Sequence, residues 1–103
     1  MDYKVIWTDE ALSDVEEIAE FIEKDSHFYA SVVVTNIINT TRSLVDYPYS
    51  GSIVPEENNK YLREHFIYSY RVIYEIRESL IYVLAVVHGR RLLNPVIKDR
   101  IKL

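Results

Sequence analysis

The sequence contains no cysteine, and it has only two glycines and three prolines among its 103 residues. Without cysteine, neither a disulfide framework nor a thiolate metal site can form, which is compatible with a reducing cytoplasm. The first ten residues, MDYKVIWTDE, show no basic and apolar leader, and no apolar run approaches the ~20 residues that a membrane-spanning helix needs. We therefore expect a soluble, cytoplasmic protein with no membrane contact.

Apolar residues are abundant instead. Hydrophobic residues make up 49% of the chain and aromatic residues 13%, which argues against disorder. A chain of this length has enough apolar material for one core but not for two. Residues 1–103 are therefore predicted to form a single domain.

The net charge of −4 is unevenly distributed along the chain. Residues 1–47 contain ten acidic and three basic residues, a net of −7, whereas residues 48–103 contain six acidic and nine basic residues, a net of +3. This asymmetry suggests a cationic working face and an acidic back. A charged surface that only keeps the protein in solution explains the same numbers equally well.

The stretch YRVIYEIRESLIYVLAVVHGRR, residues 70–91, is the most apolar and most regularly patterned part of the chain. Val, Ile, Leu and Tyr dominate Tyr70–Ile76 and Ile81–Val87, and these residue types favour strands. The interruption at residues 77–79 is too short for a helix or for a parallel crossover. The two strands are therefore predicted to form an antiparallel hairpin that organises the rest of the chain.

Two amphipathic helices are predicted before this hairpin. In Asp9–Lys24, apolar residues recur at i, i+4, i+7 and i+11, and the outer face is acidic. A second helix is predicted over Phe28–Asp46 from its 3.6-residue period, with Ser26 as its N-cap. Helices joined by so short a link form an antiparallel pair, whose apolar stripes must pack on a sheet.

The remaining segments complete the predicted order β-α-α-β-β-β. Tyr3–Trp7 and Lys60–Ile67 are predicted strands, and Tyr47–Asn59 is predicted to be loop. Arg90–Leu103 is a basic tail, either a short helix or loose. The fold class is therefore α+β, with two helices on one face of a small, mainly antiparallel sheet. The other face is expected to be solvated through its tyrosines or covered by a partner, because so short a chain offers no third layer.

Several motifs follow one another along the chain: WTDEALSDVEEIAEFI, then Pro48 with Gly51 and VPE, then YLRE, YRVIYEI and LAVVHGRR. This ordered set resembles the RelE/ParE superfamily of type II toxin-antitoxin toxins. The chain is most similar to the ParE-like branch, often called plasmid stabilisation proteins. The resemblance covers about Tyr3 to Leu93 and implies the same fold that the patterns predict.

The resemblance also implies partners. A cognate antitoxin would wrap the toxin with a segment that folds on binding, and the pair could assemble into a heterotetramer or a higher complex. Two targets stay open: RelE-like members cut mRNA on the ribosome, whereas ParE-like members mostly poison DNA gyrase. An inactive, purely protein-binding relative is a third alternative. No cofactor is expected, and no His/Asp/Glu spacing resembles a metal site.

The ribonuclease alternative assigns catalytic roles by resemblance. Arg71 and His88 occupy the positions of a strand arginine and a near-C-terminal histidine, and Glu56 lies near a loop glutamate that serves some members as base. Arg63, Arg90 and Arg91 could add phosphate contacts. Two departures weaken this alternative: Gly89 stands where several ribonucleases have tyrosine, and only Lys60 represents a lysine-rich loop.

The gyrase alternative needs only a complementary surface. The candidates are the tail cations and two tyrosines as anchors: Arg90, Arg91, Lys98, Arg100, Lys102, Tyr49 and Tyr61. A basic tail at the end of a chain, however, is usually only a solvated end. Arg71, the strand arginine of the ribonuclease alternative, is also predicted to form a buried or half-buried ion pair with Glu64 or Glu75. His27 and His65 are expected at the surface, and Trp7 in the core.

Overall fold

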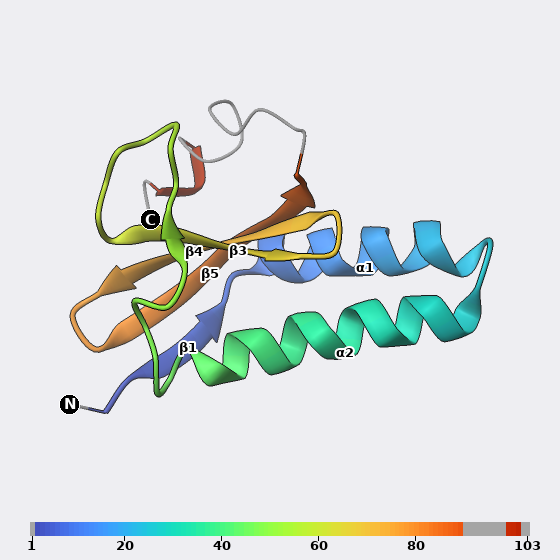
Figure 1. The fold of residues 1–103 in the computed structure, drawn as a ribbon, viewed down its shortest axis with the longest axis horizontal. Helices are drawn as coiled ribbons and strands as arrows, with labels where there is room; N and C mark the ends of the chain where they lie inside the picture. Colours follow the sequence, from blue (N-terminus) through green and yellow to red (C-terminus); the bar gives the residue numbers. More distant parts are fainter. Residues whose placement is uncertain (1, 90–98, 102–103) are drawn as a thin grey trace.

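The computed structural model describes residues 2–89 and 99–101. Its elements are, in order, β1 (Lys4–Trp7), α1 (Asp9–Glu23), α2 (His27–Ser43), β2 (Ser52–Ile53), β3 (Leu62–Ile67), β4 (Tyr70–Arg77) and β5 (Leu80–His88). Figure 1 shows the two helices side by side against one face of the sheet, with the turn between them beyond its end. The predicted α+β class and the order of its helices and long strands are confirmed.

Both helices begin at capping residues that the sequence supplies. The Thr8 hydroxyl accepts a hydrogen bond from the Ala11 amide at 3.1 Å, and the Ser26 hydroxyl accepts one from the Tyr29 amide at 3.0 Å. These contacts satisfy donors that the first helical turn leaves without partners. The second helix ends at Ser43, slightly earlier than predicted, and turns lead from there to Pro48.

The sheet has the strand order β1-β5-β4-β3-β2. The first strand pairs in parallel with the last, from Lys4 opposite Leu80 to Trp7 opposite Val83, and all other pairs are antiparallel. The strand β2 lies inside the segment predicted to be entirely loop. That detail of the prediction is wrong, because a two-residue strand has no periodicity that a sequence can display.

The predicted hairpin has its strands in simple register at its open end, where Tyr70 lies opposite His88 and Arg71 opposite Val87. A bulge between Ile73 and Tyr74 shifts the pairing further along. The turn that joins β3 to β4 contains Tyr68 with a φ of 54°. Positive φ at the first position of a two-residue turn matches the right-handed twist of the strands, although it is unusual for a bulky residue.

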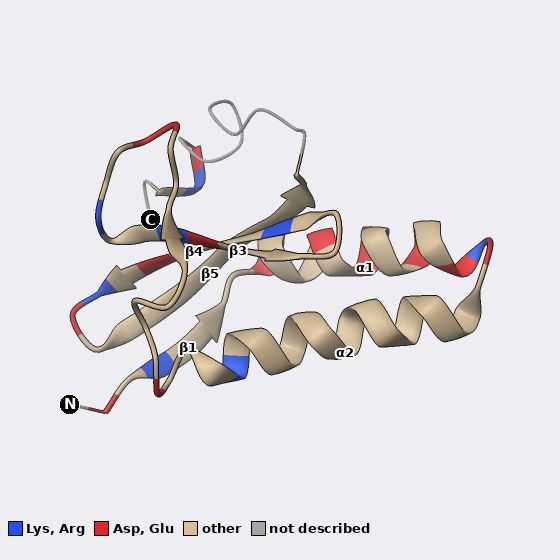
Figure 2. Cartoon of the chain, viewed as in Figure 1, with Lys and Arg blue, Asp and Glu red and all other residues tan. Residues whose placement is uncertain are grey.

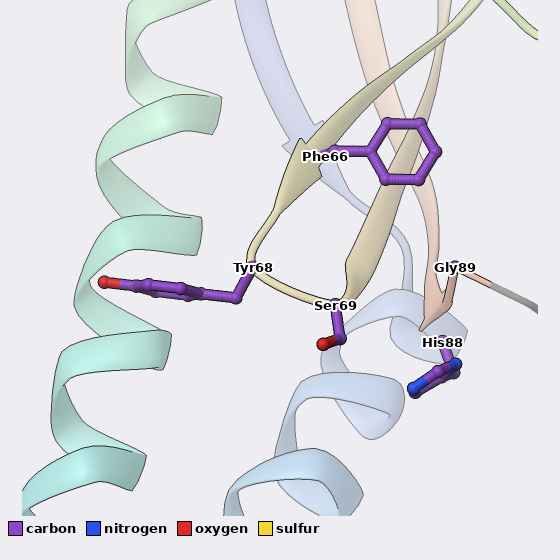
Figure 3. A pocket seen from close by; sticks show the side chains of 5 residues that line it. All are labelled: Phe66, Tyr68, Ser69, His88 and Gly89. Atoms are coloured by element: carbon purple, nitrogen blue, oxygen red, sulfur yellow. The ribbon is translucent and has the colours of Figure 1, made fainter.

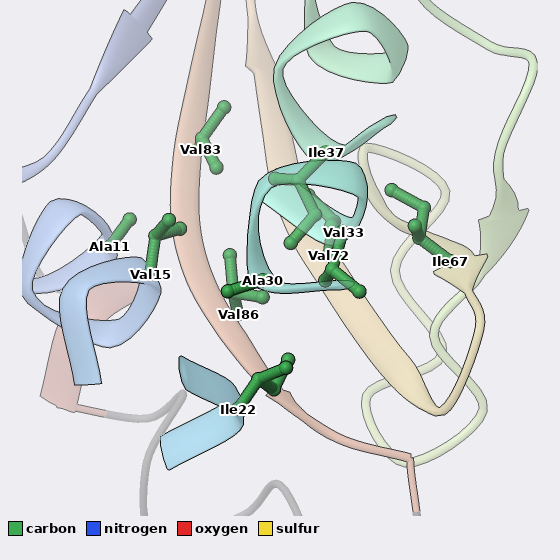
Figure 4. Close-up of a cluster of buried hydrophobic side chains, with 10 residues drawn as sticks. All are labelled: Ala11, Val15, Ile22, Ala30, Val33, Ile37, Ile67, Val72, Val83 and Val86. Carbon is green, nitrogen blue, oxygen red and sulfur yellow. The ribbon is translucent and has the colours of Figure 1, made fainter. Parts of the chain in front are cut away.

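The main core lies between the helices and the sheet (Figure 4). Valine and isoleucine side chains from α1, α2, β4 and β5 interlock there, and Trp7 packs against them partly buried. Ala11 and Ala30 are the small members that let the helices approach the sheet closely. The predicted apolar stripes therefore face the sheet.

The opposite face of the sheet carries a second core, contrary to the expectation of solvent or a partner. Its buried members come from four parts of the chain: Val54, Leu62, Ile73, Leu84, Ala85 and Val87. Ile101 from the tail packs against them. The chain thus supplies its own partial third layer, because Val54 of the loop after α2 and Ile101 both pack on this face.

Charged residues are distributed unevenly between the two helices (Figure 2). The exposed side of α1 is strongly acidic, whereas Arg42 is the sole Lys, Arg, Asp or Glu of α2. Within residues 2–89 and 99–101, neither helix is long and apolar enough to cross a membrane.

Candidate functional site

The loop between α2 and β3 is fastened to the sheet by a buried tyrosine. The Tyr74 hydroxyl donates to the Pro48 carbonyl at 2.8 Å and accepts from the Gly51 amide at 3.0 Å. A Cβ at Gly51 would lie 2.7 Å from that hydroxyl and 2.6 Å from the Glu64 carbonyl oxygen, so only glycine fits. Burial raises the pKa of Tyr74, which keeps the hydroxyl protonated as a donor.

Arg63, directly opposite Tyr74 in the sheet, fastens the same loop. Its guanidinium donates to the carbonyls of Lys60, Tyr49 and Gly51 at 2.9, 3.2 and 2.9 Å. The guanidinium also lies 5.0 Å from the centre of the Tyr49 ring. Arg63 was predicted to contact phosphate; in the structure it holds backbone, and its role toward a target stays a prediction.

Arg71 lies beneath this loop between two carboxylates. Its Nη1 and Nη2 atoms each donate to Glu56 at 3.0 Å, and its Nε donates to Glu64 at 2.8 Å. Only 6% of the Arg71 side chain is exposed. The hydrogen bonds with Glu56, followed by those with Glu64, hold the pKa of Arg71 above its ordinary value. The ion pair with Glu64 was predicted, whereas Glu75 instead pairs with Arg77 at 2.6 Å.

The structure therefore brings Arg71 and Glu56 together but separates them from His88. Arg71 pairs with Val87 and His88 pairs with Tyr70, at the same end of the sheet. Because side chains alternate along a strand, the side chains of Arg71 and His88 project from opposite faces of the sheet. The His88 ring lies 5.9 Å from the Tyr70 ring on the helix side. A catalytic group built from all three residues is not assembled in this geometry.

His88 instead borders an open hollow of about 500 Å³ at the turn between β3 and β4 (Figure 3). Phe66, Tyr68, Ser69 and Gly89 form the rest of its lining, and Phe66 is 61% exposed. The Tyr68 ring points toward α2, where its hydroxyl accepts from Asn36 at 2.8 Å. Phe66 was not singled out from the sequence. Its signal was its place in the strand, where it shares a face with Leu62 and Glu64, both of which are buried.

The other predicted contact residues are distributed over the molecule. Arg100 donates to both carboxylate oxygens of Asp14 and to the Leu84 carbonyl, so it fastens the tail to the body. Tyr49 and Tyr61 are exposed, as anchors would be. Arg90, Arg91, Lys98 and Lys102 lie outside the described residues.

The four arginines that the structure describes after residue 48 all make internal contacts, namely Arg63, Arg71, Arg77 and Arg100. The predicted cationic working face is therefore not formed by these side chains. These four side chains instead bind backbone carbonyls and carboxylates of the protein itself.

The remaining histidines have local partners. His27 lies 2.8 Å from Glu23 on the surface, as expected. His65 is partly buried instead: its ring stacks 6.1 Å from Tyr74 and lies 2.9 Å from the Ser50 hydroxyl. Burial lowers the pKa of His65. Among the described residues, no group of three or more His, Asp or Glu side chains is placed to hold a metal ion.

Two solved structures share this arrangement of helices and sheet. A chain of the chromosomal ParDE TA system from P. aeruginosa matches with a TM-score of 0.69 and 16% identity, over 84% of this chain and 95% of that one. A free double arginine mutant of the E. coli toxin RelE matches with a TM-score of 0.67 and 14% identity, over 99% and 97%. The fold is therefore that of the RelE/ParE toxins.

The sequence identifies one family within this class of toxins. The family model described as the ParE toxin of the type II toxin-antitoxin system parDE matches residues 5–93. No curated protein matches the chain. The protein belongs to the ParE toxin family, and this membership implies a cognate antitoxin as its partner.

Proposed function

We propose that this toxin, when free of its antitoxin, arrests growth by binding and inhibiting DNA gyrase. The branch of the superfamily that the chain resembles acts mostly on gyrase, and the matching family model is that of parDE. Inhibition by binding needs complementary surface and no catalytic group. The exposed Phe66, Tyr68 and Tyr61 provide aromatic surface of the kind that protein interfaces favour.

The observation that carries this proposal is the state of Arg71. A cation that stabilises a charged phosphorane must face the phosphate, yet this guanidinium is buried and held by Glu56 and Glu64. Phosphate would have to displace two carboxylates, one of them in a bidentate contact. This arrangement favours a structural role for Arg71 and a target that is bound without being cleaved.

A ribosome-dependent endoribonuclease is the second candidate. It is favoured by the match to RelE, which covers 99% of this chain with a TM-score close to that of the ParDE structure. In this function Arg71, His88 and Glu56 would act on mRNA in the decoding site. The geometry requires a rearrangement first, because His88 and Arg71 face opposite sides of the sheet.

Two assays on the purified toxin separate the candidates. Gyrase inhibition predicts loss of ATP-dependent supercoiling of relaxed plasmid at stoichiometric toxin, with no cleavage of mRNA on programmed ribosomes. The reverse result would refute the gyrase proposal. His88→Ala is the matched variant, because His88 is exposed at a strand end. Cleavage that disappears in this variant while the fold is kept would establish the ribonuclease.

Expression of the chain alone in a host tests toxicity itself. Growth arrest that is relieved by co-expressed antitoxin is the expected result, and normal growth with verified soluble protein would indicate the inactive, protein-binding alternative. The cytoplasm is the compartment in which either target would be met. We expect toxin and antitoxin to co-purify as a heterotetramer or a higher complex, which light scattering measures.

A further inference from the structure

A second hollow, which shares His88 with the one in Figure 3, lies between α1 and the ends of β4 and β5. It measures about 250 Å³. Its lining includes five apolar or aromatic residues and three polar ones: Ile18, Phe21, Tyr70, Val86 and Val87, with Asp14, Glu17 and His88. We call it the α1 groove. It combines apolar side chains with two carboxylates from α1, so it can accept an apolar group that has a positive charge beside it.

Phe21 makes the α1 groove unusual for a free surface. It is 67% exposed although it adjoins an apolar hollow that it could cover. Glu10, Asp14, Glu17 and Phe21 recur at i, i+4, i+7 and i+11, so they form one stripe beside the core-facing stripe of the helix. A partner that docks on this stripe would therefore meet one exposed phenylalanine ring and a row of three carboxylates.

A contact within the chain shows that a carboxylate beside the α1 groove can bind a guanidinium. The Arg100 guanidinium donates to Asp14 at 2.7 and 3.3 Å and to the Leu84 carbonyl at 2.8 Å. A carboxylate of α1 and a backbone carbonyl of β5 thus hold one arginine between them. Glu17 lies one turn further along the same helix, exposed, with no ion pair inside residues 2–89 and 99–101.

We infer that the α1 groove receives a segment of the antitoxin in which a bulky apolar side chain is flanked by Lys or Arg. The apolar side chain enters beside Phe21, and the flanking cation pairs with Glu17 as Arg100 does with Asp14. A segment that orders on binding can place a single side chain in so small a hollow. The inference rests on the toxin-antitoxin assignment and is independent of the choice between gyrase and the ribosome.

Titration calorimetry with the purified antitoxin, the product of the gene paired with this one, tests the inference. Glu17→Lys should weaken binding about tenfold at about 0.05 M salt and less than about threefold at about 0.5 M salt, because salt screens the repulsion. Phe21→Ala should weaken it about ten- to hundredfold at both salt concentrations. Both side chains are exposed, so circular dichroism should show an unchanged fold.

Matched controls lie on the same helix pair. Glu16→Lys makes the same charge change on α1 away from the groove, and Phe28→Ala removes an even more exposed phenylalanine from α2. Both should change the affinity less than about twofold. Equal effects of Glu17→Lys and Glu16→Lys would overturn the inference.

Two further results would assign the groove to another occupant and would also overturn the inference. Variants that keep antitoxin affinity but lose gyrase inhibition would make the groove a target site. Variants that abolish self-association of the wild-type chain, measured by sedimentation, would make it a contact between two copies. A wild-type toxin that fails to inhibit gyrase at all refutes only the proposed target, since the antitoxin titration does not involve gyrase.

Discussion

Replacing Arg71 with methionine should destabilise the protein strongly, chiefly through the buried carboxylate of Glu64 that it leaves behind. Glu64 is 6% exposed and Glu56 22% exposed at the side chain, and both are paired with this one guanidinium. Removing one partner of a buried ion pair costs about 3–5 kcal/mol, because an uncompensated charge stays buried. Since domains of this size are stable by about 5–15 kcal/mol, the variant should lie near the limit of folding.

The same reasoning predicts a rescue. Adding Glu64→Gln to Arg71→Met removes the most deeply buried carboxylate while keeping its volume, so the double variant should recover more than half of the lost stability. Low pH should partly stabilise the single variant for the same reason, since a proton on the stranded carboxylate removes its charge. Neither effect is expected if Arg71 acts only through its packing against Phe66.

Urea denaturation followed by the fluorescence of Trp7, the only tryptophan, measures both quantities. A double variant no more stable than Arg71→Met would refute the electrostatic account. The outcome also decides how toxicity data are interpreted. If Arg71→Met unfolds the protein, loss of toxicity in that variant says nothing about catalysis, and Arg71→Lys, which keeps the charge, becomes the informative substitution.

Three further predictions concern the core and the loop. Tyr74→Phe should cost about 1–3 kcal/mol in urea denaturation, because the Pro48 carbonyl and the Gly51 amide lose a buried partner; an unchanged midpoint would mean that water replaces the hydroxyl. Ile37→Ala, at a fully buried site, should cost about 2–5 kcal/mol in the same assay, and a loss below about 1 kcal/mol would contradict tight packing there. The folded-state pKa of His65 lies below the 6.5 of the unfolded chain, so its contribution to stability is complete above pH 6.5 and declines as pH falls toward the folded pKa. His65→Gln should flatten this decline, and identical pH profiles for the two proteins would refute the assignment.

Periodicity predicted most of the fold. The stripes of α1 and α2 and the apolar runs of β4 and β5 are local patterns, and each specifies which face must be buried. The parallel pairing of Lys4 with Leu80 has no such pattern, because edge strands of this length have no local signature for their partner. The second core was missed for a related reason: Val54 and Ile101 are single apolar residues whose contacts are entirely non-local.

The candidate site was harder to predict than the fold. The sequence indicated an ion pair for Arg71, but two acceptors were possible by spacing and a third, Glu56, comes from a loop whose path depends on Tyr74 and Gly51. A basic residue in a motif can face a target or hold a carbonyl, and only the three-dimensional path of the loop distinguishes the two. The alternation of β5 did specify that His88 and Val87 face opposite sides, which separates His88 from Arg71.

The parallel pairing of β1 with β5 has a consequence for synthesis of the toxin. The first strand is made at the start of translation, yet its partner residues, from Leu80 to Val83, follow only after both helices and two other long strands. A nascent chain therefore cannot complete its sheet until almost the whole protein has been made, and such distant contacts slow folding. A truncated product that ends before β5 would lack the strand that lies between β1 and β4, so β1 could not join the sheet. The last of the described strands is thus the one that joins the first strand to the rest of the sheet.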